Sequence, residues 1–198
     1  MPAAWRTMPM PETVAALPRT AQGMPVPFTV SRGHDPERIA YREETGLTVV
    51  CHCDPHTDKP VFSAQCPERQ RQCAKDGLCS VCGQHISEED YSVFGGLPLP
   101  GTNLYMEAAA HTECLSYAFK VCPVLARESG PDHPVVLAAG VRTCEARLVD
   151  TSDPNTILIF RHGDPQGRVI PLQFYLSQPI RARVLDRDSF VARFLPKD

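Results

Sequence analysis

The stretch "GLCSVCGQHI", residues 77–86, places two cysteines two residues apart and follows the second with a glycine. About thirty residues later, "HTECLSYAFKV", residues 111–121, offers a histidine and a cysteine with the same gap. A CxxC turn directs two thiolates at one ion, and Zn²⁺ takes four such ligands in a tetrahedral site. His111 and Cys114 open a predicted helix, and a spacing of three residues puts both on one face. The sequence therefore predicts one metal site, formed by Cys79, Cys82, His111 and Cys114.

This predicted ligand set leaves no coordination position for water. Three thiolates and one imidazole close the coordination sphere, which is typical of a structural zinc site and not of a hydrolytic one. We therefore expect a Zn²⁺ ion that stabilises the fold. The expected function is a non-enzymatic binding or regulatory protein, an adaptor for a protein or nucleic-acid partner.

The order of a CxxC turn, a predicted β-hairpin and a ligand-bearing helix resembles the treble-clef zinc finger over residues 77–122. The wider context, "PERQRQCAKDGLCSVCG" at 67–83 and "AHTECLSYAFKVCPVL" at 110–125, resembles a group of uncharacterised zinc-finger proteins from actinobacteria and their phages. In that group an "RQR" helix leads into the CxxCG turn, and the helix of the second ligand pair ends in "CP". The resemblance implies a structural zinc and an actinobacterial or phage origin, and it implies no activity.

HNH nucleases share the treble-clef frame, and they carry "HI", "GG" and "NL" between the cysteine pairs. The same order occurs here as His85-Ile86, Gly95-Gly96 and Asn103-Leu104. The alternative function is therefore an HNH-like metal-dependent nuclease, with His85 as the general base for water. In those nucleases the base follows the CxxC by about ten residues, whereas His85 follows Cys82 by three, so we favour the binding protein. The acids that could hold the nuclease's divalent ion are Glu88, Glu89, Asp90 and Glu107.

A second cysteine-rich stretch, "CHCDPHTD" at residues 51–58, suggests a possible second metal site. Cys51 and Cys53 share one face of a predicted strand, because side chains alternate along a strand. His56 and Cys66 would complete the ligand set. The competing interpretation is that these are buried thiols beside exposed histidines.

The formal net charge of −3 gives no overall signature of nucleic-acid binding. Local candidates for a nucleic-acid contact are Arg69, Arg71 and Lys75, on the helix predicted before the CxxC turn. Candidates for anchoring a protein partner are Tyr91, Phe94 and Tyr105, on the predicted hairpin.

The predicted fold class is α+β, with a central treble clef between an N-terminal β-hairpin and a C-terminal antiparallel β-rich lobe. Residues 1–26, rich in proline and methionine and containing Trp5, are expected to form a flexible arm. Residues 27–125 would form the hairpin and the zinc-binding domain, and residues 126–198 the β-rich lobe with its terminal helix. Strands are expected at 91–96, 103–109, 135–149, 156–161 and 168–176, and a helix at 186–195.

Nothing in the sequence predicts a secreted or membrane protein. No apolar run near the start has the length of a signal peptide, and none elsewhere approaches the roughly eighteen residues that cross a bilayer. We expect a cytoplasmic protein with no membrane association, in which the nine cysteines serve as metal ligands and core thiols. No sequence motif for an organic cofactor is evident.

Overall fold

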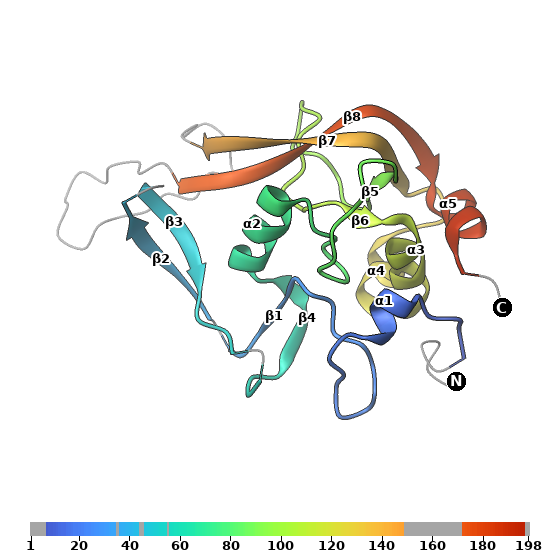
Figure 1. The fold of residues 1–198 in the computed structure, drawn as a ribbon, viewed down its shortest axis with the longest axis horizontal. Coiled ribbons are helices and arrows are strands. Elements are labelled where there is room, and N and C mark those ends of the chain that lie inside the picture. The colour runs from blue at the N-terminus through green and yellow to red at the C-terminus, as the bar shows by residue number, and fades with distance from the viewer. Residues whose placement is uncertain (1–6, 35, 44–45, 55, 149–171, 197–198) are drawn as a thin grey trace.

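The computed structural model describes residues 7–34, 36–43, 46–54, 56–148 and 172–196, and these form a mixed α+β fold (Figure 1). The α+β class predicted from the sequence is therefore confirmed. Trp5 and the predicted strand at 156–161 lie outside the described residues.

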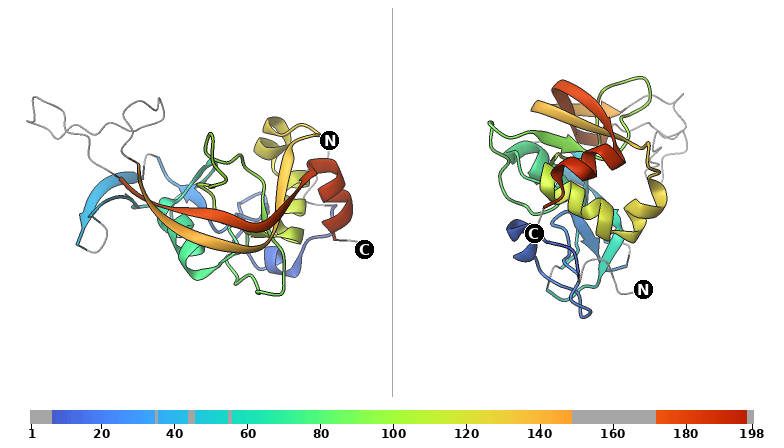
Figure 2. Two further views of the ribbon diagram at one scale, coloured as in Figure 1. Left: turned by 90° about the horizontal axis from the view of Figure 1, so that it is seen from above. Right: turned by 90° about the vertical axis from the view of Figure 1, so that its right-hand side faces the viewer.

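Six strands form one sheet, in the order β2-β3-β8-β7-β5-β6. Their bounds are β2 Glu37–Arg42, β3 Gly46–Cys51, β5 Ser92–Phe94, β6 Ala110–His111, β7 Pro134–Leu148 and β8 Leu172–Asp186. The two long strands β7 and β8 pair antiparallel along their length, and Figures 1 and 2 show this curved ribbon running across one side of the molecule. The predicted β2–β3 hairpin is confirmed, and its inner strand joins β8 in parallel at Thr48 and Gln173.

This sheet crosses the domain boundary that the sequence suggested at residue 126. Strand β5, from the predicted zinc-binding domain, pairs with β7 from the predicted C-terminal lobe. The β2–β3 hairpin likewise joins β8. The structure thus differs from a division into separate lobes, because strands from both sides of the boundary share one set of hydrogen bonds.

A second, two-stranded sheet pairs β1 (Val30–Arg32) with β4 (Pro60–Gln65). Helix α2 (Pro67–Asp76) follows β4 directly and carries a proline in its first turn, where a missing N–H costs nothing. It ends at Gly77, whose φ of 64° is the left-handed conformation that glycine adopts most readily.

Helix α3 (Thr112–Val121) ends before Pro123, as predicted, but the chain then forms a further short helix, α4 (Pro123–Glu128), that the sequence did not predict. Helix α5 (Arg187–Phe194) is confirmed. Its N-cap is Asp186, which accepts a 2.7 Å hydrogen bond from the Ser189 amide. No helix within the described ranges is long and apolar enough to cross a membrane.

The hydrophobic core lies between the sheet and the helices α3 and α5. Phe94, Leu137 and Phe190 are almost completely buried there, and Phe119 packs edge-on against Phe190 with ring centroids 6.3 Å apart. This core includes three of the four predicted metal ligands, so the metal centre and the apolar interior form one unit.

The N-terminal segment is docked on this core. Val14, on the short helix α1 (Glu12–Ala15), is only 1% exposed and belongs to the main apolar cluster. The structure therefore differs from the expected flexible arm over residues 7–26. The physical reason is that Val14 and Leu17, with Met8 and Met10, supply an apolar face that packs against the core despite the surrounding prolines.

Residues 103–109 do not form the strand that their pattern predicted. Strand β5 instead pairs with the two-residue β6, and the intervening loop contacts the sheet through one isolated bridge between Tyr105 and Ser177. The loop is held by buried side chains rather than by a strand ladder: Tyr105 is 4% exposed and lies against Phe94 at a centroid distance of 4.8 Å.

Candidate metal centre

The four residues predicted as metal ligands come together in the structure. The ligand atoms of Cys79, Cys82, His111 and Cys114 all lie within 4.8 Å of one another. The three cysteines are buried, and His111 is partly buried. The two ligand pairs are far apart in the sequence, but strand β6 brings His111 back beside the CxxC turn.

The turn that bears Cys79 and Cys82 is a tight hairpin closed by a bridge between Leu78 and His85. Inside it, the Cys79 amide donates to the Gln84 carbonyl and the Gly83 amide donates to the Cys79 carbonyl, each at 2.8 Å. Gly83 has a φ of 74°, and a Cβ atom there would lie 2.8 Å from the Phe28 ring. Only glycine satisfies both the backbone angle and this contact.

Neighbouring segments fix the turn on two sides. The Phe28 amide donates to the Val81 carbonyl at 2.8 Å, and the Ser80 amide donates to the Ala109 carbonyl at 2.8 Å. The hairpin is therefore held by one segment that precedes it in the sequence and by one that follows it. These contacts position the part of the turn that carries Cys79 and Cys82.

Backbone amides also point at the Cys79 sulfur. The amide of His111 lies 3.3 Å from Cys79 Sγ, and the amide of Cys82 lies 3.5 Å from the same atom. These two contacts fix the position of the Cys79 sulfur inside the cluster. Helix α1 adds a contact that sequence reasoning missed: Thr13 Oγ1 lies 3.4 Å from Cys114 Sγ.

His111 turns its two ring nitrogens in different directions. Its Nδ1 lies 3.4 Å from Cys82 Sγ and 3.9 Å from Cys114 Sγ, whereas its Nε2 lies 3.2 Å from the carbonyl oxygen of His85. An Nε2–H that donates to this carbonyl leaves Nδ1 as the nitrogen facing the sulfurs. Hydrogen bonding of the second nitrogen to a backbone carbonyl is the usual arrangement for metal-binding histidines.

The crowding of these groups shifts their proton affinities. Hydrogen bonds to the sulfurs of Cys79 and Cys82 raise the pKa of His111 from 6.5 to about 10. Hydrogen bonds from the Cys114 and Cys79 side chains lower the pKa of Cys82, and the same network raises that of Cys114. The cluster thus stabilises positive charge next to thiolate, and a bound cation would supply such a charge.

The donor set fits a tetrahedral thiophilic ion. With Zn–S distances of about 2.3 Å and a Zn–N distance of about 2.0 Å, ligand atoms around one zinc lie roughly 3.5–3.8 Å apart. The Nδ1 to sulfur distances of 3.4 and 3.9 Å bracket that separation. The described residues therefore form a cluster whose donor types and spacing could hold a metal ion.

Three cysteines of the second predicted site also meet. The sulfurs of Cys51, Cys53 and Cys66 lie within 4.8 Å of one another. His56 is not part of this cluster. It is exposed in a turn in which its backbone amide donates to Asp54 Oδ1 at 2.8 Å.

Two of the three basic residues proposed for nucleic-acid contact serve inside the fold. Arg69 donates to the Val30 carbonyl at 2.8 Å and to Cys53 Sγ at 3.2 Å. Arg71 donates to the Thr48 hydroxyl and to the Val49 carbonyl. One Nη2 group of each arginine is therefore bonded inside the fold, and a role of these two residues in nucleic-acid contact stays a prediction. Lys75 alone of the three is exposed.

The proposed aromatic anchors need a similar correction. Phe94 and Tyr105 are core residues, 1% and 4% exposed: Phe94 lies in β5, which pairs with β7, and Tyr105 bridges Ser177 of β8. Tyr91 is 46% exposed, and the Arg183 guanidinium stacks over its ring at 5.5 Å.

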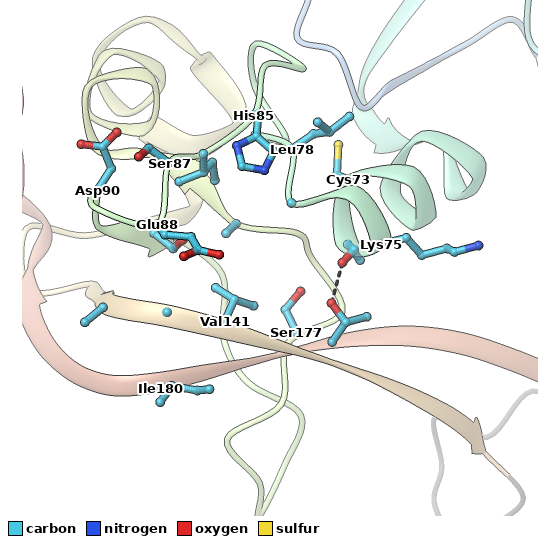
Figure 3. Close-up of a pocket in the computed structure, with 18 of the residues that line it drawn as sticks. Cys73, Lys75, Leu78, His85, Ser87, Glu88, Asp90, Val141, Ser177 and Ile180 are labelled. Atoms are coloured by element: carbon cyan, nitrogen blue, oxygen red, sulfur yellow. Dashed lines mark hydrogen bonds between the residues drawn. The ribbon is translucent and has the colours of Figure 1, made fainter.

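His85, the alternative catalytic base, is exposed and lines an open cavity of about 500 Å³ between the metal-binding turn and the β7–β8 ribbon. Figure 3 shows His85, Glu88 and Asp90 around this cavity, with Lys75 and Ser177 at its other side. Among the described residues the His85 ring makes no hydrogen bond. Glu107, in contrast, is not at this cavity. It accepts a 2.6 Å hydrogen bond from the Gly96 amide, and burial raises its pKa.

Comparisons of the chain with protein-family models, with curated proteins and with solved structures find no match. They assign no family, so the class that the site defines is that of a protein with Cys/His clusters able to bind metal. The resemblance to treble-clef proteins of actinobacteria and their phages stays a prediction.

Proposed function

We propose that this chain is a zinc-stabilised, non-enzymatic binding or regulatory protein. In this proposal Cys79, Cys82, His111 and Cys114 hold one structural Zn²⁺ ion. The observation that carries it is the convergence of four metal-ligating atoms within 4.8 Å, three of them on buried cysteines. Four protein ligands leave no position for a reactive water, which favours a structural role over a catalytic one.

Several features support a treble-clef frame around this ion. The turn at 78–85 supplies the first ligand pair, strands β5 and β6 follow it, and the start of α3 supplies the second pair. Cys114 lies in the first turn of α3, three residues after His111. The ion would cross-link the turn to the helix and so connect the two halves of the core.

The favoured partner is a protein. Strand β2 is the outer strand of the sheet, and its Ile39 and Tyr41 side chains are 45% and 72% exposed. Exposed apolar side chains on an edge strand suit strand addition or side-chain docking by another polypeptide. The internal use of Arg69 and Arg71 speaks against a nucleic-acid partner. We further propose a cytoplasmic location, since all nine cysteines are free, and an actinobacterial or phage origin.

The direct test is metal content by elemental mass spectrometry on protein purified without added metal. We expect zinc in the wild type and loss of this ion, with loss of cooperative unfolding, in Cys82→Ser. The matched control is Cys144→Ser, which removes a thiol outside both clusters and should keep the metal. Wild-type protein that folds but neither retains nor takes up zinc would refute the proposal.

The second candidate function is an HNH-like nuclease. It is favoured by one observation: His85 faces an open cavity together with Glu88 and Asp90. A general base and two carboxylates beside one cavity could bind a divalent ion and activate water. The test is Mg²⁺-dependent nicking of plasmid DNA by wild type and by His85→Ala. Nicking that the variant lacks would favour the nuclease, and equal absence of nicking in both would remove it.

A further inference from the structure

We propose that Cys51, Cys53 and Cys66 form a second metal site, which binds a thiophilic ion of the Zn²⁺ type through three thiolates and leaves the fourth coordination position open. The three sulfurs lie within 4.8 Å of one another although the residues come from different elements. This site is independent of the first cluster and of the partner-binding role proposed above.

The elements that carry these cysteines converge at one junction. Cys51 ends strand β3, Cys53 follows it, and Cys66 is the N-cap residue of helix α2. The backbone holds Cys66 firmly: its amide donates to the Thr29 carbonyl at 2.7 Å, and its carbonyl accepts from the Gln70 amide at 2.9 Å.

Arg69 supplies the observation that points to bound metal rather than to three neutral thiols. Its Nη2 donates to Cys53 Sγ at 3.2 Å, and its Nε–H is buried with no hydrogen-bond partner. Within the part of the chain that the structure describes, Arg69 makes no ion pair with a carboxylate. A partly buried guanidinium needs a nearby negative charge to offset its desolvation.

Metal binding at the cluster supplies that negative charge. Three thiolates on a divalent cation carry a net charge of −1, which the guanidinium of Arg69 neutralises. Binding releases the thiol protons to solvent and involves no change of oxidation state. Arg69 thus acts as a positioning residue that stabilises the charged site through Cys53.

The site differs from the first in its exposure. Cys51 and Cys53 are only partly buried, and among the described residues no fourth ligand joins this cluster. A solvent molecule or an added thiol would complete the coordination. Because the ion has one ligand fewer from the protein, it should exchange and leave faster than the ion held by Cys79, Cys82, His111 and Cys114.

The first experiment counts zinc ions per chain by native mass spectrometry after loading with excess Zn²⁺ and desalting. We expect two ions in wild type and in the control Cys144→Ser, and one in Cys53→Ser. In His111→Ala, which keeps the three cysteines of the first cluster, the ion of the second site should remain, which separates this proposal from the first. A single ion in wild type would overturn it, as would two ions in Cys53→Ser or a wild-type mass lower by two hydrogens, which marks a disulfide.

A second measurement uses the wild type alone, so it tests the proposal even if Cys53→Ser fails to fold. Zinc-loaded wild type is treated with N-ethylmaleimide, with and without a mild chelator, and the labelled peptides are mapped. We expect Cys51, Cys53 and Cys66 to be protected with zinc and labelled after chelation, before the ligands of the first site. Labelling of the partly exposed Cys51 and Cys53 regardless of zinc would contradict a bound ion.

The role of Arg69 is tested by competition between the protein and a chromogenic chelator. Arg69→Met should weaken zinc binding at the second site by about 10–100-fold, the range for loss of a hydrogen-bonding partner to a metal ligand. Arg69→Lys, which keeps the charge, should restore part of this loss. Zinc affinity at the first site should not change in either variant, and an equal loss at both sites would indicate a general effect on folding instead.

Discussion

The Nε2 atom of His111 lies 3.2 Å from the carbonyl oxygen of His85, so the imidazole that completes the first cluster is oriented by the backbone of the turn that begins it. The same residue, His85, places its side chain at the open cavity beside the β7–β8 ribbon. The position of the metal-binding imidazole and the shape of this cavity are therefore linked through one residue.

This orientation predicts how substitutions of His111 behave. His111→Ala removes one of four ligands, and zinc affinity should fall by more than the roughly 100-fold that loss of an outer hydrogen-bond partner causes. His111→Cys replaces the imidazole with a thiol and should retain zinc, because a four-cysteine set is also a common structural site. Chelator competition and thermal unfolding measure both. Equal zinc affinity in wild type and His111→Ala would exclude His111 as a ligand.

Substitution of Gly83 should reduce stability in two ways that can be measured separately, through the backbone angle and through a steric clash. Gly83→Ala forces a φ of 74° on a residue with a Cβ and brings that atom 2.8 Å from the Phe28 ring. Gly101→Ala is the matched control, since Gly101 has a φ of 72° and open space around it. The control should lose about 1–2 kcal/mol of stability. Gly83→Ala should lose about 1–3 kcal/mol more, from the clash. Urea unfolding of both variants measures the difference in the free energy of unfolding. Equal losses in the two variants would show that the Phe28 ring moves aside at no cost.

Docking of the N-terminal segment predicts that Val14 contributes to stability. Val14→Ala should lower the free energy of unfolding by about 1–3 kcal/mol, as expected when a buried aliphatic side chain is shortened. Gln22→Ala, on an exposed position of the same segment, should change it by less than about 0.5 kcal/mol. Denaturant titration of the two variants and the wild type measures these free energies of unfolding. A Val14→Ala protein as stable as wild type would mean that residues 7–26 are detached in solution.

Glu107 predicts a pH dependence of stability. Burial raises the pKa of this carboxyl above its ordinary 4.5, while hydrogen bonds from the Gly96 and Gly95 amides oppose the rise. The folded state therefore binds the proton more tightly than the unfolded state, so this contribution to stability is complete below pH 4.5. It is lost as pH rises through the folded-state pKa.

Glu107→Gln removes this titration. The difference in unfolding free energy between variant and wild type should therefore shift in favour of the variant as pH rises from 4.5 toward neutrality. Urea unfolding at several pH values measures it, and taking the difference cancels the titration of groups common to both proteins. A difference that is independent of pH would contradict the raised pKa.

Much of the metal centre could be predicted from the sequence because its determinants are local. The CxxC spacing, Gly83 and the placement of His111 and Cys114 at a helix start each fix geometry over a few residues. Helix α2 was predictable for the same reason, from Pro67 at its start and Gly77 at its end.

What could not be predicted depends on contacts between distant residues. The sequence pattern suggested that Tyr105 and Phe94 are surface aromatics of a hairpin, but both are buried. Phe94 lies in β5, which pairs with β7, and Tyr105 bridges Ser177 of β8. Arg69 and Arg71 read as a basic surface, but strands that precede α2 in the chain take up their hydrogen bonds. Charge and alternation patterns carry no information about which segment lies opposite, so these roles emerge only from the tertiary structure.

The parallel pairing of β3 with β8 joins Thr48 to Gln173, whose backbone oxygen the threonine hydroxyl reaches at 3.5 Å across 125 positions of sequence. Contacts of such separation form slowly, because a long loop must close before they can be made. During synthesis on the ribosome the β2–β3 hairpin emerges early and has no neighbour for β3 until β8 is translated. Until then the unpaired edge of β3 is available for pairing with other chains, which is a route to aggregation.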